Sequence, residues 1–62
     1  MIREKREQLG WTQQFLAEKV GVTKNAISNY ENGSRTPKWE VAIKLSEVLK
    51  IPLKKVIENR SS

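Results

Sequence analysis

Glycine and proline divide this chain into short segments, and no other feature limits its fold as strongly. Among the 62 residues they occur at Gly10, Gly21, Gly33, Pro37 and Pro52. Both residue types interrupt regular elements, so every helix or strand must be short. Between them apolar residues recur three or four positions apart, as on one face of an α-helix. We therefore expect an all-α fold with helices over about residues 2–9, 13–20, 24–32, 37–49 and 53–58.

Residues at the segment ends indicate where these helices begin and end. Thr12 and Thr23 precede the second and third segments, where a threonine hydroxyl can cap the helix N-terminus. Gly21 and Gly33 follow the same two segments and suit a left-handed C-cap. Pro37 suits the first position of the fourth helix.

The chain offers few groups for chemistry. Its length is enough for one small domain, which we place at residues 1–58, followed by a frayed tail at residues 59–62. Cysteine, histidine and aspartate are absent, which excludes disulfides, most metal sites, a histidine general base and a cysteine nucleophile. We therefore expect that the protein is not an enzyme and that it binds no metal, cofactor or small-molecule ligand.

The charge balance indicates the kind of partner. Twelve lysines and arginines against seven glutamates leave a net charge of +5 and a pI near 9.9. This excess favours a polyanion, either nucleic acid or an acidic membrane surface. A membrane-active helix would collect its basic residues on one face, whereas here they are spread over several segments. No apolar run has the length of a signal peptide or a membrane span, so we expect a cytoplasmic protein without a membrane partner.

The predicted helices over residues 13–20 and 24–32 are joined by a turn of about three residues. This is the pattern of a helix-turn-helix motif. Ala17 is small enough for the second helix to pack closely, Gly21 can adopt a positive φ, and Val22 fills the corner. The side chains expected to hold the two helices over a common core are Leu16, Val20, Ile27 and Tyr30.

The opposite face of the second of these helices carries short polar side chains, one cation and no acid. Asparagine can bond adenine in bidentate fashion, lysine can donate to guanine, and serine can donate or accept. A polar face on a small helical domain can also be simply solvated, but beside the turn pattern the base-reading interpretation is favoured. The exposed residues are expected to be Thr23, Lys24, Asn25, Ser28 and Asn29.

The chain resembles the Cro/cI-type helix-turn-helix family, also called the XRE family, of phage and bacterial repressors. The resemblance covers Ile2 to Ile57. It rests on Leu16-Ala17, Val20-Gly21-Val22-Thr23, Ile27-Ser28, Tyr30-Glu31-Asn32-Gly33 and a Pro37 followed by an amphipathic helix. It implies a compact five-helix, lambda-repressor-like domain, encoded by a bacterium or a phage, that binds a double-stranded DNA operator as a two-fold homodimer.

The resemblance also assigns residues to the DNA. It makes Lys24, Asn25 and Asn29 the principal base contacts, with Ser28 flanking them. Gln13 matches a position that touches phosphate and braces the recognition helix, and a helix N-terminus favours an anion. The loop after Gly33 matches a second backbone clamp. The full set expected at phosphates is Gln13, Gln14, Thr23, Asn32, Ser34, Arg35, Thr36 and Lys38.

Glu31 requires a cationic partner, because both the helix dipole and the phosphates disfavour a carboxylate at the end of a DNA-reading helix. Family members often pair this glutamate with an arginine of the first helix, and Arg6 stands at the matching position, on a face with Ile2 and Leu9. We expect a partly buried, structural ion pair between Arg6 and Glu31. Losing one partner should destabilise the fold by more than the pair contributes.

Two aromatic residues depart from the family pattern. Phe15 stands where a polar or acidic residue is usual, so the capping box that Thr12 would begin is incomplete. We expect Phe15 to pack on Trp11, or else to form part of a contact surface. Trp39 is expected in the core rather than as a stacking platform for bases.

The leading interpretation is a sequence-specific DNA-binding transcriptional regulator, a repressor that occupies a palindromic operator. Leu53, Val56 and Ile57 are candidates for the dimer surface, although the same residues could close the monomer core. The alternative is a protein-interaction module of the same fold, such as an antitoxin or adaptor. Sequence preference in DNA binding would favour the first interpretation, and exposure of Phe15 and Trp39 the second.

Overall fold

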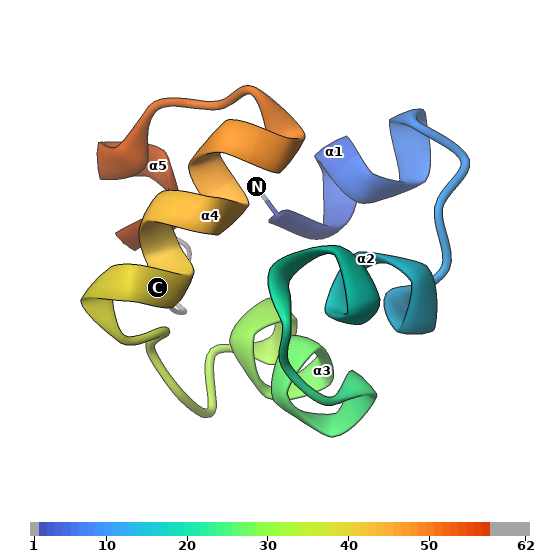
Figure 1. Ribbon diagram of the computed structural model, residues 1–62, viewed down its shortest axis with the longest axis horizontal. Coiled ribbons are helices and arrows are strands. Elements are labelled where there is room, and N and C mark those ends of the chain that lie inside the picture. The colour runs from blue at the N-terminus through green and yellow to red at the C-terminus, as the bar shows by residue number, and fades with distance from the viewer. Residues whose placement is uncertain (1, 58–62) are drawn as a thin grey trace.

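All five expected helices form. The computed structural model describes residues 2–57 and contains α1 (Ile2–Gln8), α2 (Gln13–Val20), α3 (Lys24–Asn32), α4 (Trp39–Leu49) and α5 (Leu53–Ile57) (Figure 1). The prediction of an all-α, five-helix fold is confirmed. Residue 58 of the fifth predicted helix and the tail predicted at residues 59–62 lie outside the described residues.

The ends of α2 and α3 follow the caps expected from the sequence. The Thr12 hydroxyl accepts a hydrogen bond from the Phe15 backbone N–H at 3.0 Å, and the Thr23 hydroxyl accepts one from Ala26 at 3.1 Å. Gly21 ends α2 at φ 78°, a left-handed conformation, and its N–H donates to the Ala17 carbonyl at 2.9 Å. The turn between the two helices is therefore set by local interactions.

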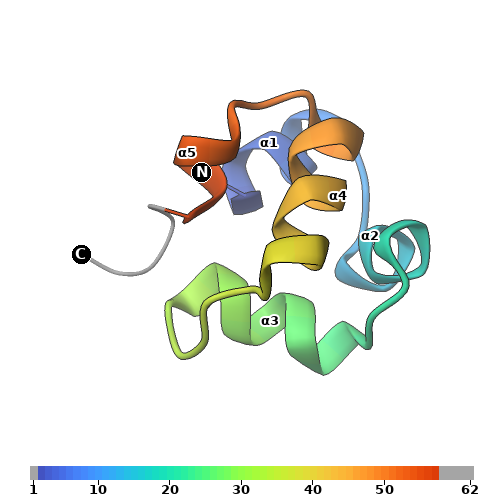
Figure 2. The ribbon, with the colours of Figure 1, turned by 60° about the vertical axis from the view of Figure 1, so that its left-hand side comes forward.

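The start of α4 was predicted wrongly, two residues too early. The helix begins at Trp39, and Lys38 is its N-cap, with an extended backbone (φ −67°, ψ 161°) and no side-chain cap. Pro37 thus lies outside the helix. An extended residue advances the chain by about 3.3 Å against 1.5 Å in a helix. The connection between the end of α3 and the start of α4 gains reach by staying extended (Figure 2).

Every helix contributes to one apolar core. Leu16, Ala17, Val20, Ile27 and Tyr30 are buried, as the helix-turn-helix pattern predicts. The largest side chains with almost no exposed surface are Ile2, Leu16, Ile27, Leu45, Leu49 and Val56. These come from all five helices, so α5, although only five residues long, is held by packing rather than by its own propensity.

Two apolar residues lie outside the core where the helical period had placed them inside. Trp39 is 62% exposed, which corrects its predicted core position. Trp39 is the first residue of α4, and the buried residues of that helix begin one turn later, at Ala42. Leu9 is also exposed, because α1 ends at Gln8 and the chain turns at Gly10.

The helices are arranged so that α3 forms one end of the molecule. The motif helices α2 and α3 pack on each other, and α4 packs on α1, α2 and α5. In Figure 2, α3 lies at the bottom and α4 rises from it toward α1 and α5. The outward side of α3 is therefore left uncovered. None of the helices in residues 2–57 is long and apolar enough to cross a membrane.

Lys50 allows a test of the helix ends. It closes α4 in a left-handed conformation (φ 56°), which a side chain with a Cβ disfavours. We expect Lys50→Gly to raise the free energy of unfolding by about 0.5–1 kcal/mol, after allowance for the extra freedom of glycine in the unfolded chain. Urea denaturation measures the change. The matched control Lys44→Gly, within the same helix, should lower the free energy of unfolding by a similar amount. A change of the same sign in the free energy of unfolding of both variants would contradict this account.

Candidate nucleic-acid interface

One side of α3 is polar and the other is buried. Ile27 and Tyr30 face the core, whereas Lys24 and Asn25 are exposed and Ser28 and Asn29 are half-buried on the outward side. Lys24, Ser28 and Asn32 are four residues apart and so form one line along the helix. Asn25 and Asn29 form a second line beside it. The residues expected at bases thus share one surface at the uncovered end of the molecule.

The loop after α3 is tied back to that helix. The Arg35 backbone N–H donates to the Asn29 carbonyl at 3.3 Å, and the Asn32 side-chain oxygen accepts from the Ser34 N–H at 2.8 Å. The second bond leaves the Asn32 amide N–H groups for other partners. The side chains expected at phosphates in this loop are all exposed: Ser34, Arg35, Thr36 and Lys38.

The two glutamines at the start of α2 have different surroundings. The Gln13 side-chain N–H donates to Glu31 Oε1 at 3.1 Å, so Gln13 connects the start of α2 to α3. Gln14 instead donates to Glu18 Oε2 at 3.0 Å, along the exposed side of its own helix. Thr23, also expected at a phosphate, is exposed but uses its hydroxyl as the cap of α3. Gln13 is the more firmly positioned of the two glutamines.

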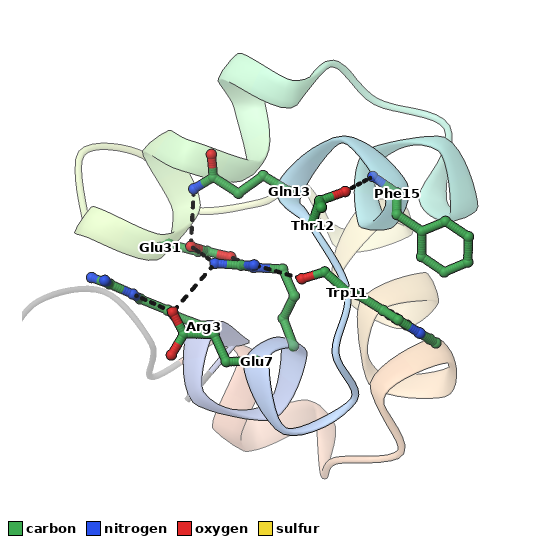
Figure 3. Close-up of polar contacts among 8 residues, drawn as sticks. Arg3, Glu7, Trp11, Thr12, Gln13, Phe15 and Glu31 are labelled. Carbon is green, nitrogen blue, oxygen red and sulfur yellow. Dashed lines mark hydrogen bonds and ion pairs between the residues drawn. The ribbon is translucent and has the colours of Figure 1, made fainter.

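The Arg6–Glu31 ion pair joins α1 to α3 (Figure 3). Arg6 Nε donates to Glu31 Oε2 at 2.7 Å and Nη2 donates to Oε1 at 3.2 Å, a bidentate geometry. Arg6 Nη1 donates to the Trp11 carbonyl at 2.7 Å. The two side chains are only 10% and 5% exposed. One guanidinium therefore holds α1, the segment before α2, and α3 together.

Arg6 keeps its charge over the ordinary pH range. The hydrogen bonds that Arg6 donates to Glu31 raise the pKa of Arg6 above its usual value, while burial opposes the charged form and lowers that pKa. Among the side chains of residues 2–57, no buried nitrogen or oxygen lacks a hydrogen-bond partner. Within the same residues, no group of three or more His, Cys, Asp or Glu side chains could hold a metal ion.

Comparison with known proteins agrees with the helix-turn-helix fold. A family model described as helix-turn-helix matches residues 2–56. The chain belongs to the XRE-type helix-turn-helix family. No solved structure gives a significant match.

Several curated proteins named as helix-turn-helix regulators are similar to this domain. It is 34% identical over 61 residues to the uncharacterized HTH-type transcriptional regulator YqaE of Bacillus subtilis, covering 98% of this chain and 53% of YqaE. It is 36% identical over 50 residues to ImmR of the same organism, covering 81% of this chain and 39% of ImmR. An uncharacterized regulator of Methanothermobacter thermautotrophicus is 43% identical over 49 residues, or 79% of this chain and 71% of that protein. The chain spans about half the length of YqaE and 18% of the length of a putative regulator of Pyrococcus furiosus.

Two aromatic residues of this helix-turn-helix domain, Trp11 and Phe15, lie away from Gln13 and Glu31. Trp11 and Phe15 pack edge to face with ring centroids 5.1 Å apart, as expected from the sequence. Lys19 Nζ lies 5.7 Å from the Trp11 ring and 5.2 Å from the Phe15 ring, within reach of cation–π attraction. Figure 3 shows Trp11 and Phe15 on the opposite side of the view from Gln13 and Glu31.

Arg3 is a residue near the interface that the sequence reasoning missed. It lines a hollow together with Gln13, Ser28 and Asn32, all expected at the DNA. Arg3 Nε donates to Glu7 Oε2 at 3.2 Å, and its side chain is 67% exposed. No pattern in the sequence identifies it, because an exposed arginine leaves no periodic signal and its closeness to Ser28 and Asn32 arises only in the folded chain.

The ion pair predicts the outcome of single and paired substitutions. Removing one partner leaves a charge in a nearly buried position, so Arg6→Met or Glu31→Leu should lower the free energy of unfolding by about 3 kcal/mol. The double variant carries no unpaired charge and should regain most of that loss. Urea denaturation of all four proteins, or cooperative melting of the double variant alone if a single variant fails to fold, measures this. If the double variant loses as much free energy of unfolding as the two single variants together, the ion pair is not the cause of the losses.

Proposed function

We propose that this helix-turn-helix domain binds double-stranded DNA sequence-specifically and regulates transcription, acting as a repressor that occupies a palindromic operator as a homodimer. The observation that carries the proposal is the uncovered face of α3, which has lysine, asparagine and serine side chains and no acid. The net charge of +5 and the regulators to which the chain is similar support it.

In this proposal α3 lies in the major groove and reads bases. Lys24 donates to guanine, Asn25 and Asn29 form bidentate bonds with adenine, and Ser28 bonds a neighbouring base edge. Phosphate contacts then fix the position of the helix on the duplex. They come from the start of α2, the cap of α3 and the loop that follows α3: Gln13, Gln14, Thr23, Asn32, Ser34, Arg35, Thr36 and Lys38.

A second copy of the chain is needed to read a full operator. Successive major-groove segments on one side of DNA are about 34 Å apart. The Cα positions of the domain extend 23 × 21 × 20 Å, so one copy reaches one half-site. Among the dimer candidates, Val56 is fully buried within its own chain, Leu53 is half-buried and Ile57 is 37% exposed. Of these three residues, Ile57 and the exposed part of the Leu53 side chain are therefore accessible to a second copy.

Substitution of α3 residues tests base reading. We expect Lys24→Ala and Asn25→Ala each to weaken binding to the preferred operator by about 1–3 kcal/mol and to relax the preference at one base position. Site selection from random DNA would first provide the operator, and titrations against single-base variants would then measure the effect. Lys44→Ala removes an equal charge from an exposed position midway along α4 and is the control for charge alone. Wild-type affinity and preference in both α3 variants would refute the proposed role of α3.

Substitution in the loop tests phosphate binding separately. Arg35→Ala and Lys38→Ala should weaken all DNA sequences about equally, because phosphates carry no sequence information. Each should also reduce the slope of log affinity against log salt concentration by about one. Titrations at several salt concentrations with operator and random DNA measure both quantities. An unchanged slope would remove that residue from the phosphate contacts.

A second candidate function is docking of a partner protein, as in an antitoxin or adaptor. It is favoured by the exposure of Phe15 (42%) and Trp39 (62%), two large apolar side chains at the surface. The same selection experiment separates the two functions. Enrichment of a palindromic sequence supports the DNA-binding function. DNA binding without sequence preference supports the docking of a partner protein.

A further inference from the structure

A polar hollow of about 250 Å³ lies where α1, α2 and α3 come together. Its lining side chains come from all three helices: Arg3, Arg6, Gln13, Ser28, Glu31 and Asn32. Arg3 lines this hollow and has no role among the contacts proposed so far.

We infer that this hollow holds a phosphate of the bound DNA, and that Arg3 on α1 binds it. The inference rests on the proposed function and extends the interface to a helix outside the helix-turn-helix motif. The ligand is a backbone phosphodiester, recognised by charge and hydrogen bonding without regard to base identity.

The position of the hollow supports this inference. Ser28 and Asn32 belong to the same line on α3 as Lys24, so the hollow opens along the edge of the face proposed to read bases. Gln13 forms another part of its wall, at the start of α2. Figure 3 shows Arg3 and Gln13 on the same side of the molecule, away from Trp11 and Phe15. DNA lying against α3 would therefore bring its backbone close to Arg3.

The charges of the hollow leave Arg3 as the cation available to a ligand. Glu31 is compensated, because it accepts two bonds from Arg6 and one from Gln13. Arg6 uses Nε and Nη2 on Glu31 and Nη1 on the Trp11 carbonyl, so its guanidinium is committed to the fold. Because of these bonds, Glu31 does not repel a phosphate as a free carboxylate would, and Arg6 does not compete with Arg3 for it.

Arg3 keeps donors for a phosphate. Among residues 2–57, the one hydrogen bond of its side chain runs from Nε to Glu7 Oε2 at 3.2 Å, which leaves the Nη1 and Nη2 groups. A planar guanidinium with two such groups matches a phosphate in bidentate geometry. The Arg3–Glu7 pair is exposed and four residues apart on one helix, so it contributes little stability and can yield or share its arginine.

A matched set of variants tests the contact. Arg3→Ala removes the proposed ligand, and Lys5→Ala removes an equal charge from α1 on the other side of its buried stripe, formed by Ile2 and Arg6. The double variant Arg3→Ala/Glu7→Ala keeps the net charge at +5, so it separates a lost contact from a change in overall charge. Operator affinity is measured at several salt concentrations, and ethylation of single phosphates identifies those whose modification weakens binding.

We expect Arg3→Ala to reduce the salt slope by about one and to weaken binding about five- to tenfold at 0.1 M salt. The double variant should keep that loss, Lys5→Ala should have a clearly smaller effect, and one phosphate that is sensitive to ethylation with wild type should become insensitive with Arg3→Ala. A wild-type slope in Arg3→Ala or in the double variant, or equal effects of Arg3→Ala and Lys5→Ala, would overturn the inference. If Asn25→Ala still weakens operator binding in that case, the proposed function survives and only the role of Arg3 fails. If the wild-type protein binds no DNA, both fail.

Discussion

The bidentate ion pair between Arg6 and Glu31 is the interaction on which the arrangement of the interface depends. The glutamate lies on the helix whose exposed face carries the polar residues, and the arginine lies on α1, which precedes the helix-turn-helix motif. Because the same guanidinium also holds the Trp11 carbonyl, and Gln13 donates to the same carboxylate, the ends of three segments meet at one cluster. In a domain of this size an apolar core alone fixes helix packing only loosely, and polar bonds of defined geometry add orientation.

Local sequence signals predicted the parts of the fold that local interactions determine. Helices α2 and α3 have the predicted limits because each begins after a threonine cap and ends at a glycine of positive φ. The start of α4 was missed because Pro37 satisfies a local rule, whereas the span from α3 to α4 is a property of the whole fold. Trp39 was misplaced for a similar reason, since a helical period cannot indicate where the core ends.

The candidate site was only partly accessible to sequence reasoning. The α3 residues could be found because the buried side of an amphipathic helix defines its exposed side. The position of Glu31 indicated that it needs a cation, and the resemblance to the family identified Arg6 as that cation. Arg3 could not be found from the sequence, because an exposed charged residue leaves no periodic signal, and its closeness to Ser28 and Asn32 arises only when α1 and α3 pack together. The packing of Phe15 on Trp11 was predicted, but the position of Lys19 over both rings depends on side-chain geometry that the sequence does not encode directly.

The short connection after α3 has a consequence for how the domain would tolerate different DNA shapes. Hydrogen bonds tie its backbone to the Asn29 carbonyl and to the Asn32 side chain, so the Arg35 backbone is held beside α3. The distance between a base edge in the groove and the phosphate that Arg35 would reach is then limited by these bonds and by the length of the arginine side chain. A duplex whose groove width departs from that distance must deform to fit, and sequences differ in the energy of such deformation. Selectivity would thus extend to base pairs that no side chain touches.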